Sequence, residues 1–151
     1  MNFNLAALKK FGFEGFIRML LASTPSCGGV YIFLRQNKRK PEFLKKGTGG
    51  KLRGNPNVEV SKLEKKWVEG AQVVYIGQTT NIRQRVKTRL EFGRGRAVRA
   101  WGGRYIWQLK DAEELLIAWK KVGPADLLKT ERMLINHFKR TYGKLPFANL
   151  R

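Results

Sequence analysis

Short apolar runs bounded by turn residues are the main pattern along this chain, and they predict buried strands. Residues 30–34 follow the turn cluster at 24–29. Residues 72–76 form a second run, and Gly77 is expected to stop that strand. Residues 105–109 predict another strand. Runs of this length match ordinary strands of a small sheet.

The stretch before Gly123 has two interpretations. Residues 115–122 are mostly apolar and favour a strand. Asp111 followed by Glu114 instead has the spacing of a capping box, which would begin a helix there. The sequence leaves both readings open.

Helices are predicted at four places. Residues 3–21 carry apolar residues at helical spacing, interrupted by two glycines, and residues 62–67 predict a short helix. Asn81 is a suitable N-cap for a helix that runs to about residue 91. Pro124 suits the first turn of a last helix, which we expect to continue to Tyr142.

These elements predict an α+β fold, with a small central, mostly antiparallel sheet flanked by helices. A length of 151 residues supports one domain with a core of its own, here 1–151. We expect an N-terminal helical segment over 1–28. Residues 35–66 are expected to be a basic insertion, because they lack the apolar residues for a separate core.

Net charge narrows the class of partner. Lys and Arg number 31 against 11 Asp and Glu, so the formal charge is +20. A charge of this size is typical of proteins that bind polyanions, and DNA is the expected partner. No apolar run approaches the roughly 20 residues that cross a bilayer, so no membrane partner and a cytoplasmic location are expected. The single cysteine, Cys27, excludes an internal disulfide.

Two basic, glycine-containing stretches are the candidate nucleic-acid contacts. Residues 35–66 hold eleven Lys and Arg against three Glu, and residues 93–104 form a second such loop. Backbone N–H groups can approach phosphates closely where glycine is present. The residues predicted to bind nucleic acid in these stretches and on the helix at 81–91 are Lys45, Lys46, Lys51, Arg53, Arg83, Arg89, Arg94, Arg96 and Arg104.

Few side chains are available for catalysis. His137 is the one histidine, which excludes two-histidine ribonuclease chemistry and histidine-rich metal sites. Only two aspartates are present, so a two-metal cluster of several carboxylates is hard to assemble. Glu64 to Lys66 resembles half of another nuclease motif, but no aspartate on a strand precedes it.

Glu131 stands out by its position on the last predicted helix. Apolar residues lie three and four positions away on either side, so the carboxylate shares their face: Leu127, Leu128, Leu134 and Ile135. A carboxylate in such a stripe is costly unless it is paired or bound to a cation. Two readings follow, a buried ion pair with an arginine or a ligand for Mg²⁺.

Five short motifs in order resemble the GIY-YIG nuclease superfamily. Gly29-Val-Tyr31 and Tyr75-Ile-Gly77 resemble the two half-motifs, and Arg85 follows Tyr75 by ten residues, as in that family. Residues 131–135, Glu-Arg-Met-Leu-Ile, match the pattern E-x-x-L-I, and residues 146–149, Pro-Phe-Ala-Asn, match P-x-x-N. The resemblance covers residues 29–149. It departs from the pattern in the long separation between the half-motifs, in Gln78, and in Arg89, where relatives often have His or Tyr.

The resemblance implies the GIY-YIG nuclease fold and a metal-dependent DNA endonuclease. It implies a tyrosine general base, with Tyr31 preferred over Tyr75 and the reverse assignment open. Arg85 would clamp the scissile phosphate, Glu131 would hold one Mg²⁺ or Mn²⁺ ion, and Asn149 would be structural or orienting, through a hydrogen bond to the metal-side loop or to a tyrosine. Lowering the pKa of a tyrosine from about 10 would need nearby cations, which Arg85 and Arg89 supply.

Other interpretations of the same residues are less specific. Tyr31 and Tyr75 on strands are often core residues, and Arg85 on a basic helix is often solvated. His137 is expected at the surface or the core edge, and Trp101, Trp107 and Trp119 in the core. The function classes left open are a restriction-type, DNA-repair or mobile-element endonuclease, a catalytically inactive DNA- or RNA-binding module on the same fold, and a basic structural protein. A homodimer on DNA would follow from a palindromic target.

Overall fold

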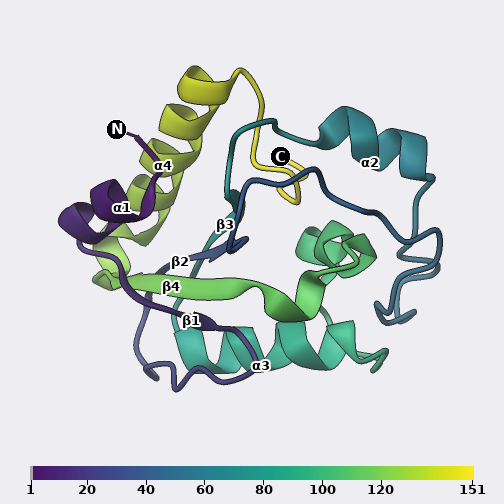
Figure 1. The fold of residues 1–151 in the computed structure, drawn as a ribbon. Coiled ribbons are helices and arrows are strands. Elements are labelled where there is room, and N and C mark those ends of the chain that lie inside the picture. The colour runs from purple at the N-terminus through teal and green to yellow at the C-terminus, as the bar shows by residue number, and fades with distance from the viewer. Residues whose placement is uncertain (1) are drawn as a thin grey trace.

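A four-stranded antiparallel sheet forms the centre of the computed structural model, which describes residues 2–151 (Figure 1). Its strands are β1 (Glu14–Arg18), β2 (Gly29–Leu34), β3 (Val73–Thr79) and β4 (Leu116–Lys121), and they lie in the order β1-β4-β2-β3. Neighbouring strands are all antiparallel. With its helices, this sheet makes the fold α+β, as the sequence predicts.

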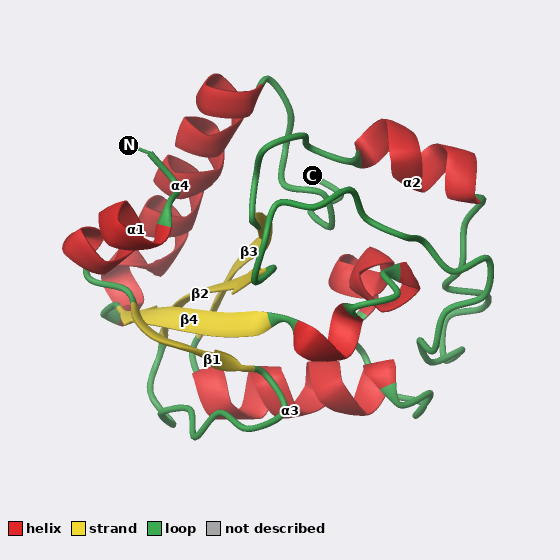
Figure 2. Ribbon diagram, in the orientation of Figure 1, coloured by secondary structure: helices red, strands yellow, loops and turns green. Residues whose placement is uncertain are grey.

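Helices cover both faces of the sheet (Figure 2). Helices α1 (Leu5–Phe11) and α4 (Leu127–Tyr142) lie on one face, and α3 (Ile82–Gly93) lies on the other. Helix α2 (Val60–Lys66) lies beyond β3, away from α1. Three 3₁₀ segments complete the elements: η1 (Trp101–Gln108), η2 (Ala112–Glu114) and η3 (Pro124–Asp126). Among residues 2–151, no helix is long and apolar enough to cross a membrane.

Alternate residues of β2 supply two separate cores. Val30 and Ile32 pack with Leu134 and Phe138 of α4 in an aliphatic and phenylalanine-rich cluster. Tyr31 and its neighbours on the other face pack with aromatic residues of η1 and with Val86 of α3. Side chains alternate across a strand, so a strand buried on both faces reads as a continuous apolar run.

The predicted N-terminal helical segment 1–28 is wrong beyond residue 11, and its first residue lies outside the described part. Gly12 ends α1 in the left-handed conformation at φ 109°, which glycine adopts without steric cost. Residues 14–18 then form β1, the edge strand beside β4. Tertiary pairing therefore overrides the helical spacing of the apolar residues here.

Two further strand predictions are wrong in detail. Residues 105–109 belong largely to η1 and not to a strand. Strand β3 does not stop at Gly77 but continues to Thr79, because Gly77 pairs with Tyr31 of β2. For residues 115–122 the strand interpretation is confirmed, and the Asp111 side chain forms no capping hydrogen bond.

Local helix signals were informative elsewhere. The Asn81 side chain accepts a hydrogen bond from the backbone N–H of Gln84 at 3.1 Å and begins α3. Gly143 ends α4 at φ 79°. Helix α2 spans Val60–Lys66, close to the predicted 62–67.

Gln108 fastens the basic insertion 35–66 to η1. Its buried side-chain amide donates to the carbonyl oxygens of Val58 at 2.9 Å and Leu44 at 3.1 Å, and its oxygen accepts from the Val58 N–H at 2.9 Å. A bridge between Phe43 and Leu109 lies beside it. The insertion has little regular structure of its own, yet it is tied to the rest of the chain through these hydrogen bonds.

Candidate active site

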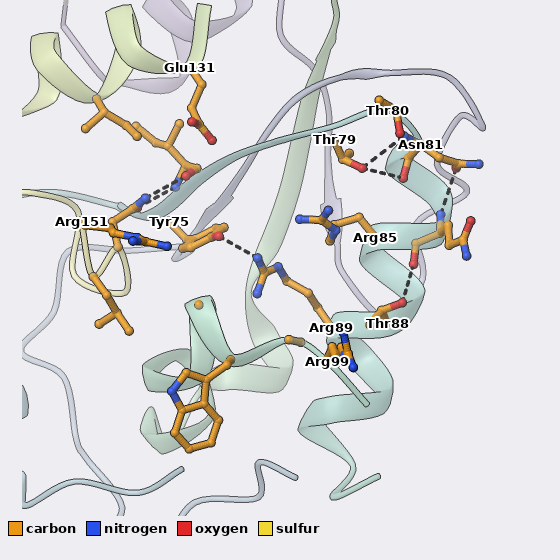
Figure 3. Close-up of a pocket in the computed structure, with 18 of the residues that line it drawn as sticks. Tyr75, Thr79, Thr80, Asn81, Arg85, Thr88, Arg89, Arg99, Glu131 and Arg151 are labelled. Atoms are coloured by element: carbon orange, nitrogen blue, oxygen red, sulfur yellow. Dashed lines mark hydrogen bonds between the residues drawn. The ribbon is translucent and has the colours of Figure 1, made fainter. Parts of the chain in front are cut away.

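A cleft of about 890 Å³ opens at the β3 edge of the sheet, between α3 and α4 (Figure 3). Because β3 is an edge strand, side chains from the helices on its two faces can meet across it. Tyr75 from β3, Arg85 and Arg89 from α3, and Glu131 from α4 all line the cleft. Residues from four of the five sequence motifs thus line one cleft, since Asn149 lines it too and Tyr31 does not.

Tyr31 and Tyr75 lie on the same face of the sheet and share one arginine. Their ring centroids are 6.0 Å apart. Arg89 Nε donates to the Tyr31 hydroxyl at 3.0 Å, and Arg89 Nη2 donates to the Tyr75 hydroxyl at 2.6 Å. The two hydroxyls are thereby held on one rigid planar group.

The two tyrosines differ in access. Tyr31 is fully buried, at 0% exposure, and it is not among the residues that line the cleft. Tyr75 is 8% exposed and lines it. Of the two, Tyr75 is the one whose hydroxyl a substrate could approach in this conformation, which reverses the order of preference from the sequence.

Arg89 was predicted as a nucleic-acid contact, and its guanidinium lies buried between the two tyrosine hydroxyls. Its side chain is 4% exposed, and among residues 2–151 no carboxylate pairs with it. Nη1 has no hydrogen-bond acceptor within that range, although Arg89 lines the cleft. A buried cation whose partners are neutral is costly, and an anion in the cleft would offset that cost. The sequence held a clue, since Arg89 lies on the buried face of α3 with Ile82 and Val86.

Burial raises the pKa of Tyr75 well above its ordinary value, and the neighbouring Tyr31 adds to this. The positive charges of Arg89 and Arg85 act in the opposite direction but do not outweigh burial. Burial lowers the pKa of the Arg89 guanidinium, but the two phenols outweigh that and raise it. The expected lowering of the tyrosine pKa is therefore absent at Tyr75. The Tyr75 phenol and the Arg89 guanidinium both keep their protons at neutral pH.

Two glycines make room for this cluster. A Cβ on Gly77 would come within 2.7 Å of the Tyr31 hydroxyl oxygen and 2.9 Å of Tyr75 Cε1. A Cβ on Gly103 would come within 2.6 Å of Arg89 Nη1. A residue larger than glycine at either position would displace the phenols or the guanidinium.

Arg85 and Glu131 face the cleft from opposite sides (Figure 3). They form no ion pair within 4.0 Å in the described residues, although Arg85 acts on the carboxylate through space. Burial raises the pKa of Glu131, while the backbone of Gln78 and the charges of Arg132 and Arg85 oppose the rise. Glu131 is partly exposed, so the buried ion pair considered from sequence is not what the structure contains.

Glu131 can supply one ligand to a divalent cation. Among residues 2–151, no group of three or more His, Cys, Asp or Glu side chains is assembled for a metal. A metal at Glu131 would therefore take its other ligands from water and substrate oxygens, as Mg²⁺ commonly does. Burial disfavours the charged form of the Glu131 carboxylate, and a bound cation would favour it.

Asn149 supports the backbone of β3. Its side-chain oxygen accepts from the Ile76 N–H at 2.9 Å, and its side-chain nitrogen donates to the Ile76 carbonyl oxygen at 2.9 Å. The backbone N–H of Ala148 donates to Val74 at 2.8 Å. Asn149 thus holds the backbone of the residue that follows Tyr75, and its side chain contacts Ile76 rather than a tyrosine hydroxyl.

The predicted nucleic-acid contacts fall into three groups. Arg53 and Arg89 line the cleft, as do Arg99 and Arg151, which were not predicted from the sequence. Lys45, Lys46 and Lys51 line a second concavity of about 710 Å³ on the insertion. The remaining residues lie outside both. Arg94 is exposed, Arg83 bonds to the Thr24 carbonyl oxygen at 2.8 Å, Arg96 lies 3.8 Å from Glu91, and Arg104 packs on Trp101.

Two aromatic predictions have different outcomes. Trp107 and Trp119 are buried in the core, as expected. Trp101 is only partly buried; it packs against that core and also lines the cleft, so the core prediction is confirmed only in part. His137 is partly exposed on α4, with its ring 6.3 Å from that of Phe3, and it is not among the cleft residues, in agreement with the core-edge prediction.

Comparisons with protein-family models, with curated proteins and with solved structures gave no match to this chain. The chemistry of the cleft therefore rests on its own geometry.

Proposed function

We propose that this chain is a metal-dependent DNA endonuclease of the GIY-YIG superfamily, acting in restriction or DNA repair. One observation carries the proposal. The Tyr75 hydroxyl, held by buried Arg89, lies in the same cleft as Arg85 and Glu131, which face each other across it. A base, a phosphate clamp and a metal ligand are what hydrolysis of a phosphodiester requires.

Arg85 binds the scissile phosphate in this proposal. Its guanidinium lies in the cleft without a carboxylate partner in the described residues, so its donors are available to phosphate oxygens. Arg89 offers a further N–H from a more deeply buried position. Both cations stabilise the negative charge that develops on the phosphate oxygens in the transition state.

Tyr75 takes the proton from the attacking water. The water oxygen forms a bond to phosphorus, the bond from phosphorus to the leaving sugar oxygen breaks, and the water proton passes to the phenolate oxygen. The phenol must first release its own proton to solvent, which burial opposes and cations favour, and the leaving sugar oxygen takes up a proton from solvent. A Mg²⁺ or Mn²⁺ ion held by Glu131 would supply positive charge that stabilises the negative charge of the leaving group. The buried Tyr31 hydroxyl accepts a hydrogen bond from Arg89 Nε and so helps to fix the position of the guanidinium.

DNA is the proposed substrate because the basic residues surround the cleft. Arg53, Arg99 and Arg151 line it, and the insertion carries the lysine concavity. Affinity should therefore fall steeply as salt rises. Cleavage of both strands of a palindromic target would need two copies on the DNA, so we infer a homodimer in that case.

A catalytically inactive DNA- or RNA-binding module on the same fold is the second candidate. The observation that favours it is the resting state of the tyrosines. Tyr31 is inaccessible, and the pKa of Tyr75 is raised. Such a module would keep the basic cleft and bind without cutting.

A plasmid assay separates these candidates. Supercoiled DNA incubated with the protein and Mg²⁺ should be nicked or linearised, and EDTA should stop the reaction. Glu131→Ala should bind the DNA but not cut it. Glu64→Ala is the matched control, because Glu64 is exposed on α2 and belongs to the alternative motif. Cutting by Glu131→Ala at the wild-type rate would contradict the proposal, and sequencing the ends would reveal the cut geometry.

A further inference from the structure

Trp101 is an aromatic residue in a cleft that otherwise suits phosphate. The other three tryptophans, Trp67, Trp107 and Trp119, are 8%, 6% and 6% exposed. Trp101 is partly exposed and lines the cleft. Phosphate is bound by cations and N–H donors, and the apolar face of an indole ring does not contribute to that binding. A partly exposed indole in such a place points to a flat apolar ligand.

Trp101 is braced in its position. The guanidinium carbon of Arg104 lies 4.4 Å from the centre of the indole ring, within the range of a cation–π contact. Arg104 Nη1 also donates to the Trp101 carbonyl oxygen at 3.2 Å. The ring is therefore oriented before any ligand arrives, which lowers the entropic cost of binding.

The residue that follows Trp101 lies close to the catalytic tyrosine. A Cβ placed on Gly102 would come within 3.9 Å of the Tyr75 hydroxyl oxygen. Gly102 also lines the cleft, together with Arg99 and Arg53. Trp101, Tyr75 and the arginines thus line one cleft, in which a base and its phosphate could both be bound.

We propose that Trp101 is a stacking platform for an unpaired nucleobase next to the scissile phosphate, so that the cleft takes single-stranded or locally opened DNA. The inference rests on the proposed function of the cleft in DNA cleavage. In a duplex each base is covered by its neighbours, and an aromatic side chain can stack on it only after it leaves the helix. A basic groove combined with an aromatic platform is the usual means of binding single strands.

Tryptophan fluorescence tests the contact without catalysis. A short oligothymidylate, titrated into the protein in EDTA, should quench the emission of the wild type. In Trp101→Phe the quenching should disappear while the emission of the three buried tryptophans remains. Quenching of the same size in Trp101→Phe would overturn the proposal, as would its absence in the wild type under conditions where the oligonucleotide binds.

Affinity tests the preference. Trp101→Leu should lose about 10-fold in affinity for the oligothymidylate and change little for a blunt hairpin duplex. Trp101→Phe keeps an aromatic ring and should stay within about 2-fold of the wild type for both. Circular dichroism melting establishes that each variant is folded. Equal losses for both ligands, or none for either, would overturn the proposal.

Cleavage assays keep this inference separate from the proposed function. If Mg²⁺ supports cutting but duplex and bubble substrates are cut equally well, and Trp101→Leu behaves like the wild type, the stacking platform is wrong and the nuclease stands. If nothing is cut, yet the quenching and the single-strand preference are found, the nuclease is wrong and the base-binding cleft stands.

Discussion

The two faces of the sheet are built from alternate residues of the same strands but contain different chemistry. On the face covered by α4, Val30 and Ile32 meet Leu134 and Phe138 in an apolar core. On the face covered by α3, Tyr31 and Tyr75 surround a guanidinium. The first face gains stability from apolar burial alone. The second buries a positive charge, which is costly unless an anion joins it.

The buried charge of Arg89 lowers the stability that the α3 face could otherwise have. A chain selected for stability alone would place a hydrophobic residue at position 89, since replacing buried charge by apolar side chains is often neutral or stabilising. The polar cluster also lies at the β3 edge, where α4 reaches past the sheet and brings Glu131 to the cleft. We therefore expect substitutions on the apolar face to lower mainly the free energy of unfolding, and substitutions on the polar face to lower mainly the cleavage rate.

The largest expected effect comes from the phosphate clamp. Arg85→Ala should lower kcat/KM about 10³-fold, or roughly 4 kcal/mol, because its positive charge acts mainly on the transition state. Thermal stability should change little, since Arg85 is partly exposed. Lys87→Ala is the matched control, an exposed cation on the same helix. Equal losses in the two variants would mean that Arg85 contributes only to the general charge of the surface.

A substitution on the apolar face should do the reverse. Ile32→Ala removes a side chain that is 1% exposed and should cost about 3 kcal/mol of unfolding free energy. The kcat of the folded fraction should stay near the wild-type value. Urea denaturation gives the stability, and single-turnover cleavage at low temperature gives the rate. A large loss of rate in fully folded protein would break the division between the two faces.

Substitutions of the two tyrosines should have different effects. Tyr75→Phe should lower the cleavage rate about 10²-fold if its hydroxyl is the general base, and it should flatten the rise of rate with pH. Tyr31→Phe leaves the cleft lining unchanged, but it removes the acceptor of Arg89 Nε and should reduce stability by about 1–3 kcal/mol. A larger loss of rate in Tyr31→Phe than in Tyr75→Phe would restore Tyr31 as the base.

The smallest effect concerns Glu131. Its raised pKa means that the folded chain holds the carboxyl proton more tightly than the unfolded chain does. Stability therefore falls as pH rises from the ordinary glutamate pKa through the raised one. Glu131→Gln should accordingly be more stable than the wild type at neutral pH, by less than about 1 kcal/mol because Glu131 is partly exposed and water screens the effect, and this advantage should shrink as the pH is lowered. Melting curves at neutral and at acidic pH check this, and a less stable variant at neutral pH would contradict it.

Much of the fold was visible in the sequence because local signals agreed with tertiary ones. The apolar runs of β2 and β3 and the Asn81 cap of α3 are examples. Residues 14–18 were missed because an edge strand with a bulge has no clean alternation. Residues 105–109 were read as a strand because buried aromatic residues favour strands and 3₁₀ segments alike.

The site was predictable only in part. The resemblance implied that Arg85 and Glu131 share a site, and both side chains line the same cleft. The depth of Tyr31 and the pairing of Arg89 with both hydroxyls depend on the packing of α3 against β2 and β3, which spacing does not reveal. The place of Trp101 in the cleft depends on the path of η1, whose first residues were predicted as loop and whose residues 105–108 were predicted as strand.

The clamp of Asn149 on Ile76 also bears on how copies of this chain can meet. An open edge strand is a template for pairing with a strand of another molecule. The Asn149 side chain hydrogen-bonds to the outward-facing N–H and carbonyl of Ile76, and the Ala148 N–H donates to the Val74 carbonyl oxygen. These backbone groups of β3 are therefore not available to pair with a strand of another molecule. At the opposite edge, β1 is short and bulged, with Phe16 at φ 57°. Strand addition is thus disfavoured at both edges of the sheet, and we expect a second copy to approach through helices and loops.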